Sequence, residues 1–296
     1  TAAVVPTWDG EGRLSTGQAF GVALEELGQQ REDLWVLDAD LEKPCQLSGF
    51  AKNHPERFLE MGIAEQDMVS CAGGLALRGK LPIVNTYAAF LRRAYEQIYV
   101  NASEGARIIY VGHYAGLCYT TDGKTHQCTG DVAMMRAIPG MTVLYPSVPE
   151  EVPQMLDWYL GRGGGQLYLR LHRTPSVRDF SRAGIRFSQG RGVCIRDVRA
   201  DEAVLTSGPH LLSGCSEALD MMEPRRDLWV VSTLRGLSSD FVFSLAKKYQ
   251  RFWIIEEVFE AGGLFDEVVG KLSNLYQRGK IQRWPEIVRR AVDGFT

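Results

Sequence analysis

Short runs of β-branched and aromatic residues alternate with longer amphipathic segments along most of this 296-residue chain. Such alternation is typical of strands separated by helices, and it predicts mostly parallel sheets with helices on both faces. The rhythm breaks at residues 176–191, where Ser, Gly and Arg indicate a linker. We therefore expect an α/β protein of two doubly wound, mostly parallel-sheet domains, at residues 1–175 and 192–296.

Periodicity also places the individual elements. In the first block we expect a helix at 17–30 and strands at 34–40, 57–61, 81–87, 106–112, 141–146 and 166–171. In the second block we expect strands at 201–208, 227–233 and 251–257, and helices at 210–222, at 238–249 and from about 262.

Composition excludes several classes of protein. Lys and Arg number 33 against 36 Asp and Glu, so the net charge of -3 gives no reason to expect nucleic acid or an anionic membrane as partner. The apolar runs are too short to span a membrane, and no basic region followed by an apolar one opens the chain, so we expect a cytoplasmic protein. Six cysteines without CxxC or Cys/His zinc spacing predict buried apolar side chains rather than a metal site or disulfides.

In parallel sheets, ligands bind beyond the carboxyl ends of the strands. The segments that fall there are Asp38 and Asp40, and residues 61–65, 85–90, 112–119 and 170–173.

Glu65 is the most informative of these residues. It lies in MGIAEQDMVSCAGGLAL, residues 61–77, and a helix beginning near Ala64 would place it on one face with Met68, Val69 and Ala72. A glutamate in a first helical turn is also stabilised by the helix dipole, which is the structural alternative. The otherwise apolar helix favours a functional role, because a buried carboxylate needs a hydrogen-bonding partner. The Gly73-Gly74 pair predicts that another backbone approaches this helix closely.

Two further groups could carry chemistry. The loop TDGKTHQCTGD, residues 121–131, presents Asp122 and His126, and histidine suits proton transfer, although a loop histidine is more often a surface residue. Tyr87 and Phe90 lie three residues apart at a strand-to-helix turn, where they can pack in the core or grip a flat ring.

Together, LDADL, GIAEQDMVSCAGG, NTYAAFLRRAYEQ, DGKTHQ, AMMRAIPGMTVLYPS and IIEEVFEAGGL resemble the pyrimidine-binding and C-terminal portion of the transketolase family, whose enzymes use thiamine diphosphate. The resemblance covers nearly the whole chain. It implies that Glu65 hydrogen-bonds N1′ of the cofactor's aminopyrimidine and favours the imino tautomer. Tyr87 and Phe90 would flank that ring, and Asp40 would lie beside the cofactor.

The same resemblance assigns the substrate side. Asp122 and His126 would approach the substrate, and His126 would act catalytically, with His113 as its substitute. Tyr114 occupies the position of a family histidine, and Arg170 lies near a phosphate-binding arginine of the family, although Arg173 is an alternative.

The family's GDG motif and its downstream asparagines, which bind Mg²⁺ and the diphosphate, are absent from this sequence. The resemblance therefore implies a separate N-terminal, diphosphate-binding subunit that supplies the ligands of Mg²⁺ and diphosphate, in an α2β2 heterotetramer.

Three departures bear on the substrate. Gly17 and Pro44 stand where the family has an Arg and a Ser in contact with a sugar phosphate, and Tyr114 stands where the family has a His. They imply transfer of a two-carbon ketol unit from a ketose with little or no phosphate to an aldehyde, in a specialised biosynthetic pathway. The alternatives are acyl transfer to a lipoyl or carrier-protein thiol, as in pyruvate dehydrogenase β chains, and a non-catalytic regulatory homologue.

Overall fold

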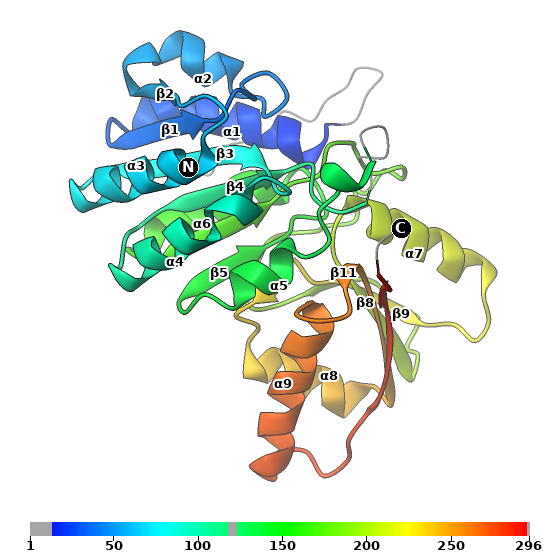
Figure 1. Ribbon diagram of the computed structural model, residues 1–296. Coiled ribbons are helices and arrows are strands. Elements are labelled where there is room, and N and C mark those ends of the chain that lie inside the picture. The colour runs from blue at the N-terminus through cyan, green and yellow to red at the C-terminus, as the bar shows by residue number, and fades with distance from the viewer. Residues whose placement is uncertain (1–13, 118–122, 295–296) are drawn as a thin grey trace.

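A computed structural model describes residues 14–117 and 123–294 and contains two mostly parallel sheets, as predicted (Figure 1). The strands of the first sheet lie in the order β10-β5-β6-β4-β3-β1-β2, and only β10 runs antiparallel to its neighbour. Their bounds are β1 Leu34–Asp38, β2 Phe58–Glu60, β3 Leu81–Tyr87, β4 Ile109–His113, β5 Met141–Leu144, β6 Gln166–Arg170 and β10 Thr233–Arg235.

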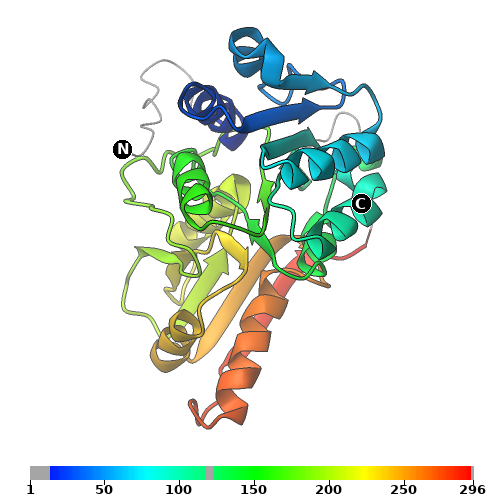
Figure 2. The same cartoon turned by 90° about the vertical axis from the view of Figure 1, so that its left-hand side faces the viewer.

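Helices cover both faces of this sheet (Figure 2). Alternate strand residues point to opposite faces, so Ile83 and Ile109 pack with α1 and α6, whereas Val84 and Tyr110 pack with α3, α4 and α5. The helices are α1 Thr16–Gln30, α2 Ser48–Asn53, α3 Glu65–Leu77, α4 Tyr95–Ser103, α5 Asp131–Arg136 and α6 Glu151–Gly161, with short 3-10 turns η1 Pro55–Arg57, η2 Leu91–Ala94 and η3 Gly123–Thr125.

The second sheet has the order β12-β11-β8-β9-β7, with β7 antiparallel. Its elements are β7 Val193–Arg196, β8 Glu202–Thr206, α7 Pro209–Met221, β9 Asp227–Val230, α8 Ser239–Lys248, β11 Arg251–Phe259, α9 Leu264–Gln277 and β12 Glu286–Val292. Among the described helices, none is both long and apolar enough to cross a membrane.

The single strand predicted at residues 227–233 is two separate strands in the structure. Residues 227–233 divide into β9 of the second sheet and the start of β10, which leaves that sheet and pairs with β5 of the first. The edge strands β7 and β12 were not predicted. Both are only partly buried, so they lack the apolar run by which the buried strands were found.

Candidate functional site

Glu65 is the first residue of α3, and its side chain is 2% exposed. Met68, Val69 and Ala72 are buried on the same face, which is the stripe that the spacing predicted. The close approach predicted at the glycines involves a side chain rather than a backbone. A Cβ on Gly73 would collide with the amide of Asn101 from α4, whereas one on Gly74 would meet nothing within 4 Å.

The carboxylate of Glu65 makes one hydrogen bond with the described residues, a long one of 3.3 Å from Nη1 of Arg93. Arg93 lies in η2 and its side chain is half exposed. Sequence reasoning missed this residue, although its position three residues after Phe90 placed it at the same turn. The bond leaves acceptor capacity on a buried carboxylate, which fits a ligand that offers a ring N–H.

Four rings form an aromatic cluster near this turn: Tyr87, Phe90, Tyr114 and His126. Their centroids lie 5.3 Å apart for Tyr87 and Phe90, 4.4 Å for Tyr87 and Tyr114, and 5.2 Å for Phe90 and His126. The hydroxyl of Thr125 lies 2.8 Å from Nδ1 of His126 and orients its ring. The cluster thus joins the end of β3, the residue after β4 and the loop after η3.

Tyr87 and Phe90, the two rings expected to flank the pyrimidine, lie directly against each other. Their rings stack on each other with an interplanar angle of 25°. A third ring between them would need about twice the usual stacking distance. A pyrimidine could lie against an outer face of the pair without any movement, whereas flanking by both rings stays a prediction that requires the rings to separate.

His113, the last residue of β4, is not a member of the cluster. Its ring is buried, packs edge-on against Phe20 at 5.5 Å, and has Nε2 3.5 Å from Oδ1 of Asn85. Burial lowers the pKa of His113 to about 3, so the ring is neutral. The role of His113 as a substitute for His126 stays a prediction, and in this arrangement its buried, neutral ring would have to become accessible before it could contact a substrate.

Arg170 is also placed differently from the prediction. Its side chain is fully buried, with Nε 2.8 Å from Oδ2 of Asp131, Nη1 3.2 Å from Oε1 of Glu257, and Nη2 3.2 Å from the carbonyl of Cys128. It is a structural residue that ties the loop and both blocks together. Arg173 instead faces the aromatic cluster, with its guanidinium carbon 5.2 Å from the ring centroid of Tyr114.

At the end of β1, the two aspartates differ in environment. Asp40 is exposed and adopts a left-handed backbone conformation with φ of 59°. Asp38 is buried and accepts a 2.7 Å hydrogen bond from the amide of Leu41. Burial, with a contribution from Glu60, raises the pKa of Asp38 to about 7. Glu60, which sequence reasoning missed, accepts from the amides of Asp40 at 2.9 Å and Gly62 at 2.7 Å.

Two predicted features fall elsewhere. Asp122 lies outside the described residues, as does Cys118. Within the described ranges, one group of side chains has metal-ligand character, namely Cys194, Asp197 and Asp227. The ammonium of Lys248 lies 3.0 Å from Asp227 and 3.4 Å from Asp197, so a lysine already balances these carboxylates. The five described cysteines are free thiols.

Known proteins resemble both the sequence and the fold. The family described as transketolase, pyrimidine binding domain, matches residues 13–176. A putative uncharacterized transketolase family protein of Sinorhizobium fredii is 31% identical over 92% of this chain and 79% of its own length. Transketolase-like protein 2 of Mus musculus is 32% identical over 94% of this chain but only 43% of its own length, so the chain spans less than half of that relative.

A solved structure described as a split gene transketolase, inactive beta4 tetramer, is 30% identical and superposes with a TM-score of 0.82 over 96% of this chain and 91% of that chain. The transketolase of Campylobacter jejuni, at 16% identity and a TM-score of 0.75, matches at the level of the fold. The chain therefore belongs to the transketolase family, of which it contains the pyrimidine-binding domain and the C-terminal portion.

Proposed function

We propose that this chain is the β subunit of a two-component, thiamine diphosphate- and Mg²⁺-dependent transketolase-like enzyme. It transfers a two-carbon ketol unit from a ketose to an aldehyde. The observation that carries the proposal is Glu65, a buried carboxylate with one long hydrogen bond, held beside an aromatic turn. We also propose residues 1–175 as the pyrimidine-binding domain, 176–191 as a linker and 192–296 as the C-terminal domain.

Each residue would act through ordinary hydrogen bonding or stacking. Glu65 would hold a proton at N1′ of the aminopyrimidine, and the Tyr87–Phe90 pair would offer one aromatic face to the same ring. Thiamine diphosphate, when bound, supplies the carbon nucleophile that attacks the ketose carbonyl. His126, oriented by Thr125, would donate to or accept from a substrate oxygen.

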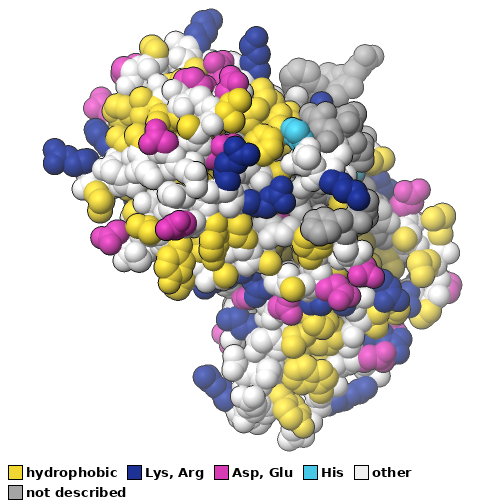
Figure 3. All heavy atoms as spheres, in the orientation of Figure 1, with side chains coloured by type: hydrophobic (Ala, Val, Ile, Leu, Met, Phe, Trp, Pro, Cys, Tyr) yellow, Lys and Arg dark blue, Asp and Glu magenta, His cyan; other side chains and the backbone are white. Residues whose placement is uncertain are grey.

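The need for a partner is supported by sequence and surface. The chain has no GDG motif with which to bind the diphosphate and its metal. Large apolar side chains are exposed around α3 and α4, where hydrophobic side chains gather on the surface (Figure 3). They are Ile63, Leu77, Tyr99 and Val100. Such a patch is typical of an interface. A β4 tetramer of the split gene relative is described as inactive, which agrees with activity only in an α2β2 complex.

The substrate is proposed to carry little or no phosphate. Gly17, Pro44 and Tyr114 offer no cationic side chain. Arg170 is committed to Asp131 and Glu257, so Arg173 is the arginine of this segment that faces the aromatic cluster. A single arginine binds a phosphate less tightly than the several charge-assisted contacts of a phosphate site.

The test is reconstitution with a separate chain that carries a GDG motif. Cofactor binding is measured by calorimetry and ketol transfer by product formation. Glu65→Gln should lower turnover by about 10²- to 10⁴-fold, the usual contribution of positioned proton transfer. The control is Glu32→Gln in the exposed turn between α1 and β1, which should be fully active. Normal turnover in a complex that carries Glu65→Gln would contradict the proposal.

A further inference from the structure

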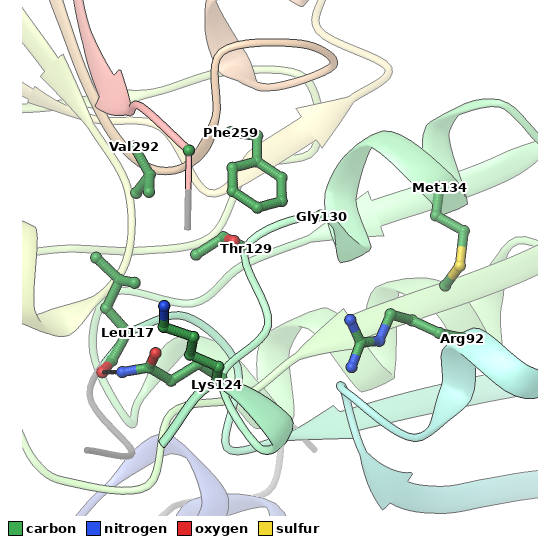
Figure 4. Close-up of a pocket in the computed structure, with 10 residues that line it drawn as sticks. Arg92, Leu117, Lys124, Thr129, Gly130, Met134, Phe259 and Val292 are labelled. Atoms are coloured by element: carbon green, nitrogen blue, oxygen red, sulfur yellow. Dashed lines mark hydrogen bonds between the residues drawn. The ribbon is translucent and has the colours of Figure 1, made fainter. Parts of the chain in front are cut away.

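A cavity of about 300 Å³ lies between the loop after η3 and the second block (Figure 4). Its apolar lining comes from Leu117, Met134, Phe259 and Val292, and its polar side chains are Arg92, Lys124, Gln127 and Thr129. The wall is well anchored, because the amide of Phe259 donates a 3.0 Å hydrogen bond to the carbonyl of Thr129. This volume lies at the lower end of the range that accepts small organic ligands.

The charges around the cavity are unbalanced. Arg92 enters it from η2 and Lys124 from η3, while none of the described lining residues is acidic. Among the residues that the structure describes, the guanidinium of Arg92 makes one hydrogen bond, from Nε to the carbonyl of Ala89 at 2.8 Å. Neither cation forms an ion pair with any residue in the described part of the chain. Two like charges that face one cavity without a counter-ion favour the entry of an anion.

The remaining lining sets the rest of the ligand. Phe259 provides an aromatic face and Met134 an adaptable apolar side chain, so the space beside the two cations is suited to a compact apolar body. A phosphate ion or a polyol would make little apolar contact with this wall. We propose that the cavity binds a small organic anion, a carboxylate on an aromatic or branched body, with its charged end towards Arg92 and Lys124.

The lining of the cavity includes neither Glu65 nor a member of the aromatic cluster, and the inference does not rest on the proposed enzymatic function. It is built from this chain alone, so its binding can be measured without partner or cofactor. A failed binding test would therefore contradict this proposal alone, and a failed activity test would contradict the proposed enzymatic function alone.

The binding test uses the full chain and three probes in calorimetry and saturation-transfer NMR. Benzoate carries both the charge and the ring, benzyl alcohol only the ring, and acetate only the charge. Benzoate should bind at least about tenfold more tightly than either of the others, since it alone makes charge-assisted bonds together with apolar contact. Equal binding of benzyl alcohol and benzoate, or no benzoate binding at millimolar concentration, would overturn the proposal.

Substitutions of the lining residues test whether benzoate binds in this cavity. Arg92→Gln and Lys124→Gln should each weaken benzoate about tenfold. Both positions are exposed, so folding is preserved. Gly130 can accept a side chain, because a Cβ would contact only Phe259, at 3.5 Å, and the backbone φ of Gly130 is -100°. Gly130→Glu would therefore place a carboxylate in the cavity, and its negative charge should abolish benzoate binding. Lys80→Gln, at an exposed site outside the cavity lining, should bind normally. Unchanged affinity in the Arg92→Gln, Lys124→Gln double variant would place the site elsewhere.

Discussion

Nε of Arg170 lies 2.8 Å from Oδ2 of Asp131, and neither side chain is exposed to solvent. The same guanidinium reaches Glu257 in the second block and the carbonyl of Cys128 in the loop that carries His126. Because β6, α5, β11 and this loop meet at one arginine, Arg170 sets how the loop is held against both sheets.

Removing this arginine should be costly. Arg170→Met leaves Asp131 and Glu257 buried without their cation, and breaking a buried ion pair in this way costs about 3–5 kcal/mol of unfolding free energy. Urea denaturation monitored by tryptophan fluorescence measures the change. Arg225→Met removes an arginine from an exposed pair with Glu223 and should leave stability nearly unchanged. A similar, small effect of both substitutions would show that the buried network contributes little.

The adjacent glycines of α3 should respond in opposite directions to alanine. Gly73→Ala forces a methyl group into the amide of Asn101, which itself donates a 2.9 Å hydrogen bond to the carbonyl of Val69, and should destabilise the fold by about 1–3 kcal/mol. Gly74→Ala meets no atom and should stabilise the helix by about 0.5–1 kcal/mol. Thermal unfolding of the two variants decides the matter, and equal melting temperatures would contradict the packing described.

A buried acid should make stability depend on pH. Burial raises the pKa of Glu151 from its ordinary value near 4.5 to about 7, although it accepts hydrogen bonds from the amide of Ser147 and the hydroxyl of Ser232. Between pH 4.5 and 7 the folded state therefore keeps a proton on Glu151 that the unfolded state has lost. The corresponding stability, about 3 kcal/mol, is present below pH 4.5 and is lost as pH rises through 7.

Glu151→Gln isolates this effect, because glutamine does not titrate. The stability of the variant minus that of the original protein should increase from pH 5 to pH 8. Burial also raises the pKa values of Asp38 and Glu256 to about 7, but both acids are present in both proteins and cancel in the difference. Denaturation curves at four pH values provide the measurement, and a constant difference would contradict the shift for Glu151.

An arginine at position 17 should change substrate preference. A Cβ on Gly17 would meet only ordinary contacts, the nearest being the carbonyl of His172 at 3.4 Å, with Nδ1 of His113 at 3.9 Å. Gly17→Arg should raise kcat/KM for a phosphorylated ketose relative to the free sugar by about 10- to 100-fold, the value of one charge-assisted contact. Gly17→Met controls for side-chain length. If the arginine variant keeps the original preference, the proposal of a weakly phosphorylated substrate loses its main support.

The elements that could be predicted from the sequence are those with a local residue pattern. The buried strands β3, β4 and β6 have continuous apolar runs, and α3 has its inward stripe, so both sheets and the orientation of Glu65 could be predicted. The strand β10 has three residues and pairs with β5, about 90 positions earlier in the chain, and no local pattern reports such pairing.

The site was predictable to the same extent. The spacing of Tyr87 and Phe90 predicted an aromatic turn, whereas their direct stacking depends on side-chain rotamers that no spacing fixes. Arg170 and Arg173 lie in one short segment of the sequence, but Arg170 is buried in ion pairs whereas Arg173 faces the aromatic cluster. They can be told apart only by which one faces Asp131 and Glu257, which come from distant parts of the chain.

Strand β10 has a consequence for any attempt to divide the protein. It is contributed by residues beyond the 176–191 segment, yet it caps the outer edge of the first sheet by pairing with β5. A cut in that segment would strip β5 of its neighbour and leave open backbone groups that invite aggregation. The two halves should accordingly melt together, as a single cooperative unit, and neither half is expected to be stable when expressed by itself.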